Sequence, residues 1–304
     1  MAGKELSLII ATYNRGSKLW TTLNSLICQT LRHDIWELVV VDNNSTDDTA
    51  SRFAFWAGEH PEIVDVKVPG IIQGYPAARN RGIEESCGRY IVVIDDDEIV
   101  APGFLEEYYR LFSEHADVAA AGGRILPDFE DGTPRWMSKY TERAIAGTLD
   151  LGGAVCDFPD GAFFGGGNHG YRRSVVERYG GYDTSLGRTG GVLLAGEEKE
   201  FYKRIHAGGE RIVYLPDAVI YHLVGRDRLT RDSFMRLCRY LGRIERRCTL
   251  SVSNGRYFQR LSVEGIIWGG ASVLAVGYCC GGHPSRGGYL LLMRWHITAG
   301  LLGA

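Results

Sequence analysis

Short apolar runs alternate with amphipathic stretches over the first part of the chain. Four mainly aliphatic runs predict buried strands at 6–11, 38–41, 63–68 and 90–94. Apolar residues at helical spacing and helix-start signals predict helices at 17–29, 48–59, 76–86 and 102–114. Strands that are apolar throughout are typical of sheets buried on both faces. The pattern therefore predicts an α/β fold with a mostly parallel sheet and helices on both faces.

The pattern becomes less regular beyond the fourth predicted helix. Residues 122–170 contain many Gly, Pro and aromatic residues and predict loops. Further short elements are predicted as helices at 174–179 and 196–208 and strands at 211–215 and 218–221, on either side of Pro216. The last of these strands ends beside His222, and the composition changes directly after it.

The C-terminal part is basic and then apolar. Residues 226–260 contain ten Arg and no Lys, beside an apolar stripe at helical spacing. Residues 265–282 carry no formal charge, and a helix of that length would span about 27 Å, just short of a hydrocarbon core. A second apolar segment, 287–304, contains Arg294 and His296. We therefore expect two domains, residues 1–225 and a helical region of residues 226–304.

The formal net charge of -3 is a sum over these two parts. Residues 1–225 hold 22 basic and 33 acidic residues, whereas residues 226–304 hold 12 and 4. Basic residues beside apolar segments are attracted to anionic lipid at about 1 kcal/mol per charge. We therefore expect membrane association, with a soluble helical subdomain as the alternative. Nucleic-acid binding is not expected, because no recognised module accompanies the arginines.

The overall composition excludes several classes of protein. With 45% hydrophobic and 23% charged residues, the chain is neither disordered nor collagen-like. Its seven cysteines include no CxxC pair, so we expect free, mostly buried thiols in a reducing compartment. The N-terminus lacks the basic and long apolar regions of a secretory signal, so we expect a cytoplasmic catalytic domain.

Three consecutive carboxylates follow the strand 90–94. Asp95, Asp96 and Asp97 repel one another, and a bound cation would relieve that repulsion. In an extended chain Asp95 and Asp97 point to the same side, so both could approach one Mg²⁺ or Mn²⁺ ion. His222 is a candidate third protein ligand. The alternative is a solvated acidic turn.

Other polar residues at strand and helix ends have two interpretations each. Asp42 could accept a hydrogen bond from a nucleobase or ribose, or belong to a helix-capping turn. Arg79 could bind a base or diphosphate, or lie on the surface. Glu197 and Glu198 could supply a general base, or only complement a helix dipole. No GxGxxG follows the first strand and no GxxxxGK[ST] is present, which argues against dinucleotide and P-loop sites.

Six motifs together resemble the family 2 inverting glycosyltransferases with the GT-A fold, over about residues 5–225. They are Ala-Thr-Tyr-Asn-Arg, Val-Asp-Asn-Asn-Ser-Thr-Asp-Asp-Thr, Ala-Ala-Arg-Asn-Arg-Gly, Asp-Asp-Asp, Gly-Glu-Glu-Lys-Glu-Phe and Tyr-Leu-Pro-Asp-Ala-Val-Ile-Tyr-His. The resemblance implies a Rossmann-like sheet, a nucleotide-sugar donor with a UDP-sugar favoured, and Mn²⁺ or Mg²⁺ as cofactor.

The resemblance also implies roles for individual residues. The residues that it assigns to the nucleotide are Thr12, Tyr13, Asn14, Arg15, Asp42, Asn44 and Arg79. Those assigned to the metal and diphosphate are Asp95, Asp97 and His222, with Asp96 facing the ribose or the donor sugar. Glu198 corresponds to the catalytic base of the family's Glu-Asp motif. Because Glu replaces the commoner Asp, Glu197 stays an alternative. The segment 165–168 corresponds to the loop between donor and acceptor pockets.

The implied reaction is direct displacement at the anomeric carbon, with a saccharide or a lipid-linked saccharide as acceptor. Such an enzyme would serve cell-surface polysaccharide or glycolipid synthesis at the inner face of the plasma membrane. The alternatives are an inactive sugar-nucleotide scaffold and a nucleotidyltransferase. The acidic triplet and Glu198 argue against the first. The segment 12–17 is a poor triphosphate-binding loop, which argues against the second.

Overall fold

The computed structural model describes residues 3–69, 73–159, 161–186, 196–250 and 252–304. The chain forms two compact units. Unit 1 comprises Met1–Leu126 and Leu149–His222, and unit 2 comprises Pro127–Thr148 and Leu223–Ala304. The division into domains at residues 225 and 226 stays a prediction.

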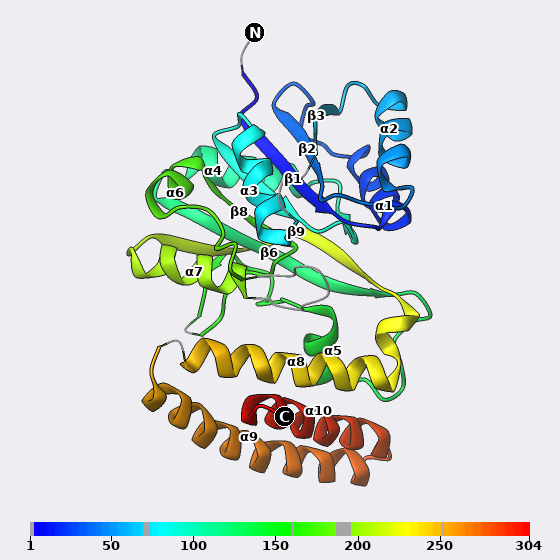
Figure 1. Cartoon of the computed structure of the whole chain (residues 1–304), viewed down its shortest axis with the longest axis vertical. Coiled ribbons are helices and arrows are strands. Elements are labelled where there is room, and N and C mark those ends of the chain that lie inside the picture. Colours follow the sequence, from blue (N-terminus) through cyan, green and yellow to red (C-terminus); the bar gives the residue numbers. More distant parts are fainter. Residues whose placement is uncertain (1–2, 70–72, 160, 187–195, 251) are drawn as a thin grey trace. The chain divides into compact units, whose positions relative to one another are not determined.

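A mixed β-sheet crosses unit 1 in the order β3-β2-β1-β4-β8-β6-β9-β5, with β7 paired to β9 (Figure 1). Its strands are β1 (Leu6–Thr12), β2 (Trp36–Asp42), β3 (Val64–Pro69), β4 (Tyr90–Ile94), β5 (Glu98–Val100), β6 (Val118–Phe129), β7 (Cys156–Asp157), β8 (Asn168–Arg172) and β9 (Arg211–Val224). Strand β1 pairs in parallel with β2 and β4, and β2 with β3. Strands β4, β6 and β8 are joined by antiparallel pairs, as are β5, β7 and β9.

The sheet separates two hydrophobic cores in unit 1. Alternation along β1 directs Leu8 and Ile10 into one core and Ile9 and Ala11 into the other. The first core includes residues of α1 (Gly16–Leu26), α2 (Thr49–Glu59) and α4 (Phe104–Glu114). The second includes residues of α3 (Tyr75–Glu85), α6 (Arg173–Tyr179) and α7 (Glu197–Ala207). The predicted α/β fold with helices on both faces is therefore confirmed.

The eight elements predicted before residue 115 are all present, but the later part differs from the prediction. The supposed loops of 122–170 contain most of β6, all of β7, part of β8, and α5 (Lys139–Ala146). Pro216 does not divide two strands, because it lies between the parts of β9 that pair with β7 and with β5. None of the seven cysteines forms a disulfide in the described chain, but five are exposed, so the expected burial is wrong.

Unit 2 is helical. It contains α5, a short 3₁₀ helix (Arg226–Leu229), α8 (Arg231–Leu250), α9 (Asn254–Cys280) and α10 (Pro284–Leu302). Its core joins Met137 and Ile145 to Phe234 and Cys238 of α8 and to Met293 of α10. By length and composition, α9 is the one helix among the described residues that could cross a membrane.

Glycines allow α8 and α10 to pack closely. A Cβ at Gly242 would lie 2.0 Å from the backbone oxygen of Ile297, and one at Gly300 would lie 2.0 Å from that of Arg239. Neither backbone position can accept a side chain without a shift of the two helices. The contact therefore depends on these two glycines.

We predict that Gly300→Ala destabilises the protein by about 1–3 kcal/mol, because the added methyl group overpacks the helix contact. Gly288→Ala in the same helix is the matched control, since no atom lies within 4 Å of its added Cβ. The control should gain up to about 1 kcal/mol from helix propensity. Denaturant unfolding measures both, and equal stabilities for the two variants would contradict the close packing.

Candidate active site

The loops that follow β1 and β2 are tied together at the carboxyl edge of the parallel strands. Asn14 accepts a hydrogen bond of 2.7 Å from the Thr46 N–H and donates its own N–H to Ser45 Oγ over 2.9 Å. Asn14 and Asn44 adopt positive φ values, which Asn tolerates better than most residues. Asp42 Oδ1 accepts the Ser45 N–H at 2.9 Å, so this carboxylate stabilises its own turn. Its predicted contact with a nucleotide stays a prediction.

The first loop also reaches the acidic triplet. Thr12 Oγ1 donates to Asp96 Oδ2 over 2.7 Å, and Arg15 Nη1 donates to Asp96 Oδ1 at 2.9 Å and Asp97 Oδ2 at 3.0 Å. Lys18, which the sequence did not indicate, lies 3.4 Å from Asp97. Burial raises the pKa of Asp96 to about 6, against the attraction of Arg15. Tyr13, which directly follows Thr12 in the sequence, has an exposed side chain.

The triplet is not an extended strand. Strand β4 ends at Ile94 and the chain turns at Asp96 and Asp97 before β5 begins. The expectation that Asp95 and Asp97 point to one side of an extended chain is therefore wrong. Asp95 accepts hydrogen bonds from Arg79 at 2.8 Å and from the Tyr75 hydroxyl. Asp95 therefore pairs with Arg79 and Tyr75, whereas Asp96 and Asp97 share Arg15.

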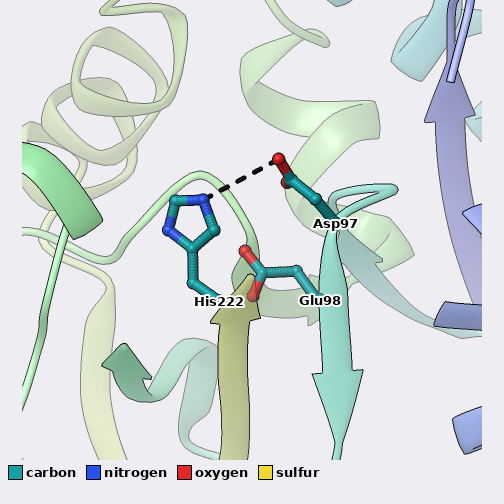
Figure 2. A group of neighbouring side chains, drawn as sticks. All are labelled: Asp97, Glu98 and His222. Carbon is teal, nitrogen blue, oxygen red and sulfur yellow. Dashed lines mark ion pairs between the residues drawn. The ribbon is translucent and has the colours of Figure 1, made fainter. Parts of the chain in front are cut away.

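Figure 2 shows a candidate metal centre formed by Asp97, Glu98 and His222. One ligand atom from each residue lies within 4.8 Å of the others, and His222 Nε2 is 3.8 Å from Asp97 Oδ2. Glu98 and His222 face each other directly in the antiparallel register of β5 and β9. Carboxylate oxygens with an imidazole nitrogen suit Mn²⁺ and also accommodate Mg²⁺, so the donor set fits the predicted cofactor.

Glu98 was not predicted from the sequence as a metal ligand. The residue follows the triplet directly, so a fourth consecutive acid was the available signal. Its role depends on the turn at Asp96 and Asp97 and on the pairing of β5 with β9, which no local pattern revealed.

Arg79 is completely buried, so its placement on the surface is excluded. Its guanidinium donates to Glu198 Oε1 at 2.8 Å, to Asp95 Oδ1 at 2.8 Å and to the Gly166 oxygen at 2.7 Å. It also lies over the Tyr75 ring, 4.2 Å from the centroid. One cation thus joins α3 to the end of β4, to the start of α7 and to the segment 165–168, which we call the glycine-rich loop.

The two acids at the start of α7 have different surroundings. The Glu198 side chain is 17% exposed and pairs with Arg79 at 2.8 Å. The Glu197 side chain is 3% exposed and lies 4.0 Å from the same guanidinium. Burial and the neighbouring Glu198 charge raise the pKa of Glu197 to about 7. Glu198 is therefore the more accessible carboxylate of the pair.

Two consecutive glycines connect Glu198 with the candidate metal centre. A Cβ at Gly166 would lie 2.3 Å from Glu198 Oε1. A Cβ at Gly167 would lie 2.3 Å from Glu98 Oε1 and 3.3 Å from Asp95 Cγ. Since consecutive Cα atoms are about 3.8 Å apart, the candidate base and the candidate metal ligands border the same short piece of backbone.

A buried histidine fixes this glycine-rich loop. Burial and the nearby Arg79 charge lower the pKa of His169 to about 3, so its ring is neutral near pH 7. Its Nδ1 lies 3.0 Å from the Gly165 carbonyl oxygen and its Nε2 contacts the Tyr182 hydroxyl. Because a carbonyl only accepts, the neutral ring carries its proton on Nδ1. His169 therefore holds the loop as a hydrogen-bond donor.

The family model described as "Glycosyl transferase family 2" matches residues 7–180. The curated glucosyl-dolichyl phosphate glucuronosyltransferase of Haloferax volcanii is 26% identical over 229 residues, which are 72% of this chain and 69% of that protein. The uncharacterized glycosyltransferase YibD of Escherichia coli is 30% identical over 143 residues, which are 46% of this chain and 39% of that protein. The matched region thus covers about two thirds of one relative and well under half of the other.

A solved structure similar to this chain is the mannosyltransferase PcManGT of Pyrobaculum calidifontis in complex with GDP-Man and Mn²⁺. It has a TM-score of 0.65 and 18% identity, and the match covers 98% of this chain and 86% of that one. At this identity the likeness concerns the fold, and the predicted GT-A fold is confirmed.

The raised pKa of Glu197 predicts a pH-dependent cost in stability. An ordinary glutamate titrates near 4.5, whereas the folded chain holds this proton until about pH 7. Stability therefore falls as the pH rises from about 4.5 to 7, and Glu197→Gln removes that loss. We expect the melting temperatures of Glu197→Gln and wild type to be equal near pH 4.5. Above pH 7 the variant should melt higher than wild type by a constant amount.

Thermal melts in EDTA across this pH range measure the effect. The matched control is Glu114→Gln, a change at an exposed position at the end of α4. Its difference from wild type gives the baseline against which the pH dependence of Glu197→Gln is compared. A pH-independent difference for Glu197→Gln would show that Glu197 does not retain its proton in the folded chain.

Proposed function

The chain belongs to glycosyl transferase family 2, and on this basis we propose a metal-dependent transfer of a sugar from a nucleoside diphosphate to an acceptor hydroxyl, with inversion at the anomeric carbon. The placement of Gly166 beside Glu198 and of the next residue, Gly167, beside Glu98 carries the proposal. It brings a base and a cation-binding group to one place, as a displacement with an anionic leaving group requires.

The donor is proposed to bind at the edge formed by the ends of β1, β2 and β4. Open α/β sheets bind ligands beyond the carboxyl ends of their strands. The residues proposed for the nucleotide are Thr12, Tyr13, Asn14, Arg15, Asp42, Asn44 and Arg79. A UDP-sugar is the favoured donor. Arg15 pairs with Asp96 and Asp97, so a donor diphosphate would offer its guanidinium a competing anionic partner.

Asp97, Glu98 and His222 would hold Mn²⁺ or Mg²⁺. When bound, the ion would neutralise charge on the departing nucleoside diphosphate. Asp95 stays a predicted ligand, and its carboxylate and that of Glu98 both border Gly167. Asp96 is proposed to face the ribose or the donor sugar.

Glu198 is proposed as the catalytic base. Its side chain is more exposed than that of Glu197 and pairs with Arg79 at 2.8 Å. As the acceptor oxygen bonds to the anomeric carbon, Glu198 takes the hydroxyl proton and the bond to the diphosphate oxygen breaks. Arg79, which also donates to the Gly166 carbonyl oxygen, holds the carboxylate in position.

Unit 2 is proposed to rest on the inner face of the plasma membrane. One side of α9 packs through Glu264, Ala271 and Ala275, while Ile266 and Val273 are 75% and 73% exposed. An exposed apolar face of this kind is unusual in a soluble monomer. Arginines in the same unit complement anionic lipid.

The proposed acceptor is a saccharide or a lipid-linked saccharide in the synthesis of cell-surface polysaccharide or glycolipid. The name of the Haloferax volcanii relative specifies a glucosyl-dolichyl phosphate acceptor, which supports a lipid-linked class. A membrane-bound unit 2 would keep the enzyme at the surface where such acceptors lie.

Removal of the proposed base should lower turnover. We expect Glu198→Gln to reduce kcat by about 10²–10⁴-fold with little change in donor affinity, since a positioned base contributes about that factor. Glu197→Gln should lose less, because Glu197 is nearly inaccessible. Glu200→Gln, two residues further along α7, is the control. Transfer assays with a panel of nucleotide sugars measure the effect, and near-normal turnover of Glu198→Gln would exclude it as the base.

Removal of a proposed metal ligand should affect donor binding. We expect Asp97→Ala to abolish the Mn²⁺-dependent part of donor binding, because it removes one of two carboxylates in the candidate centre. Calorimetry with and without Mn²⁺ measures the loss, with the exposed Asp117→Ala as control. Unchanged Mn²⁺-dependent binding would contradict the metal assignment. Donor binding without any transfer by the wild type would instead support a sugar-nucleotide scaffold.

A further inference from the structure

Unit 2 contains a cavity of about 610 Å³ at the C-terminal ends of α8 and α10. The residues that line it are Arg243, Arg246, Arg247, Leu250, Gly300 and Gly303. We call it the arginine cavity. None of these residues belongs to the proposed catalytic site, and all of them lie within unit 2.

The three arginines share one face of α8. Residues three and four apart are neighbours on a helix surface, so Arg243, Arg246 and Arg247 direct their side chains to the same side. No ion pair with an Asp or Glu side chain is found for them within the described part of the chain. Arg243 donates one hydrogen bond of 3.0 Å to the backbone oxygen of Ala304, which leaves most of its N–H groups for another acceptor.

The opposite wall is formed by backbone. Gly303 adopts a φ of +96°, and a Cβ at this position would lie 3.4 Å from the Arg246 guanidinium carbon. A glycine here keeps the end of α10 close to the guanidinium without covering it. The cavity is therefore open, strongly basic and bounded on one side by main chain.

This chemistry fits a phosphate group. Guanidinium groups bind phosphate oxygens through paired hydrogen bonds, and three adjacent cations repel one another until an anion is present. Leu250 adds an apolar contact inside the cavity. Val252, two residues after Leu250, is 67% exposed, and Leu302, directly before Gly303, is 60% exposed. A basic cavity that also offers the apolar contact of Leu250 suits a headgroup phosphate that remains attached to acyl chains.

We propose that the arginine cavity binds the phosphate of an anionic membrane lipid. This inference rests on the membrane contact proposed for unit 2. The exposed apolar face of α9 would contact the acyl region, and the cavity would bind one headgroup specifically. The cavity would then provide one defined lipid-binding site in addition to the general attraction between a basic surface and an anionic membrane.

The test is binding of the full-length protein to vesicles. The probe is phosphatidylcholine vesicles with and without phosphatidylglycerol, and the readout is co-sedimentation at fixed ionic strength. The site variant replaces Arg243, Arg246 and Arg247 by Gln. The matched control replaces the exposed Arg231, Arg236 and Arg256 of the same unit by Gln, so that both variants lose the same net charge.

We expect the site variant to bind anionic vesicles on the order of 100-fold more weakly than wild type, because it loses the paired hydrogen bonds to the headgroup phosphate as well as the general attraction of three charges. The control should retain at least tenfold more binding than the site variant. Equal losses in the two variants would overturn the site and leave only non-specific attraction. Retained binding by the site variant would overturn it as well.

Two further arms separate the possible sources of failure. Glycerol phosphate at the concentration of the accessible lipid should not displace the protein, and displacement would show that the cavity takes free phosphate esters instead. Mn²⁺-dependent donor binding should be unchanged in the site variant, which shows that it is folded. A wild type that transfers sugar but binds no vesicles would overturn the lipid proposal while leaving the glycosyltransferase function intact.

Discussion

The buried guanidinium of Arg79 and its anionic partners form the interaction on which the candidate active site depends. A buried cation is costly unless anions and hydrogen-bond acceptors surround it. Its partners Asp95, Gly166 and Glu198 lie 16, 87 and 119 residues away in sequence. The charge is therefore compensated only when the end of β4, the glycine-rich loop and the start of α7 are all in place. The same contacts that compensate Arg79 also fix the proposed base.

The other constraint is repulsion among the acids that follow β4. Three cations, Arg15, Lys18 and Arg79, compensate the three aspartates, and Asp96 and Asp97 share Arg15. Asp95 pairs with Arg79, Asp96 with Arg15, and Asp97 with Arg15 and Lys18. Glu98 instead lies across from His222 in the register of β5 and β9. The turn between β4 and β5 thus converts a repulsive run of charge into two functional groups, one around Arg79 and one suited to a divalent ion.

The strands and helices before residue 115 were predictable because their apolar pattern reflects burial against the sheet. The position of the acidic residues at its carboxyl edge followed from the same pattern. The surroundings of Arg79, by contrast, depend on contacts between distant segments, so its complete burial was not visible in the sequence. Glu98 was missed for a similar reason, since strand pairing opposite His222 gives this glutamate its significance. Pro216 misled the prediction because local propensity does not show which neighbours a long strand pairs with.

The division of the chain into units has a consequence for the order in which the protein is made. Residues 127–148 belong to unit 2, but the rest of that unit is encoded after the whole of unit 1. During synthesis Met137 and Ile145 therefore emerge long before Phe234 and Met293, their partners in the same core. Unit 2 cannot complete its core on a nascent chain until α10 has left the ribosome. A chain shortened at residue 225 would leave the apolar side chains around α5 without that core, so the catalytic unit cannot be isolated by a single cut.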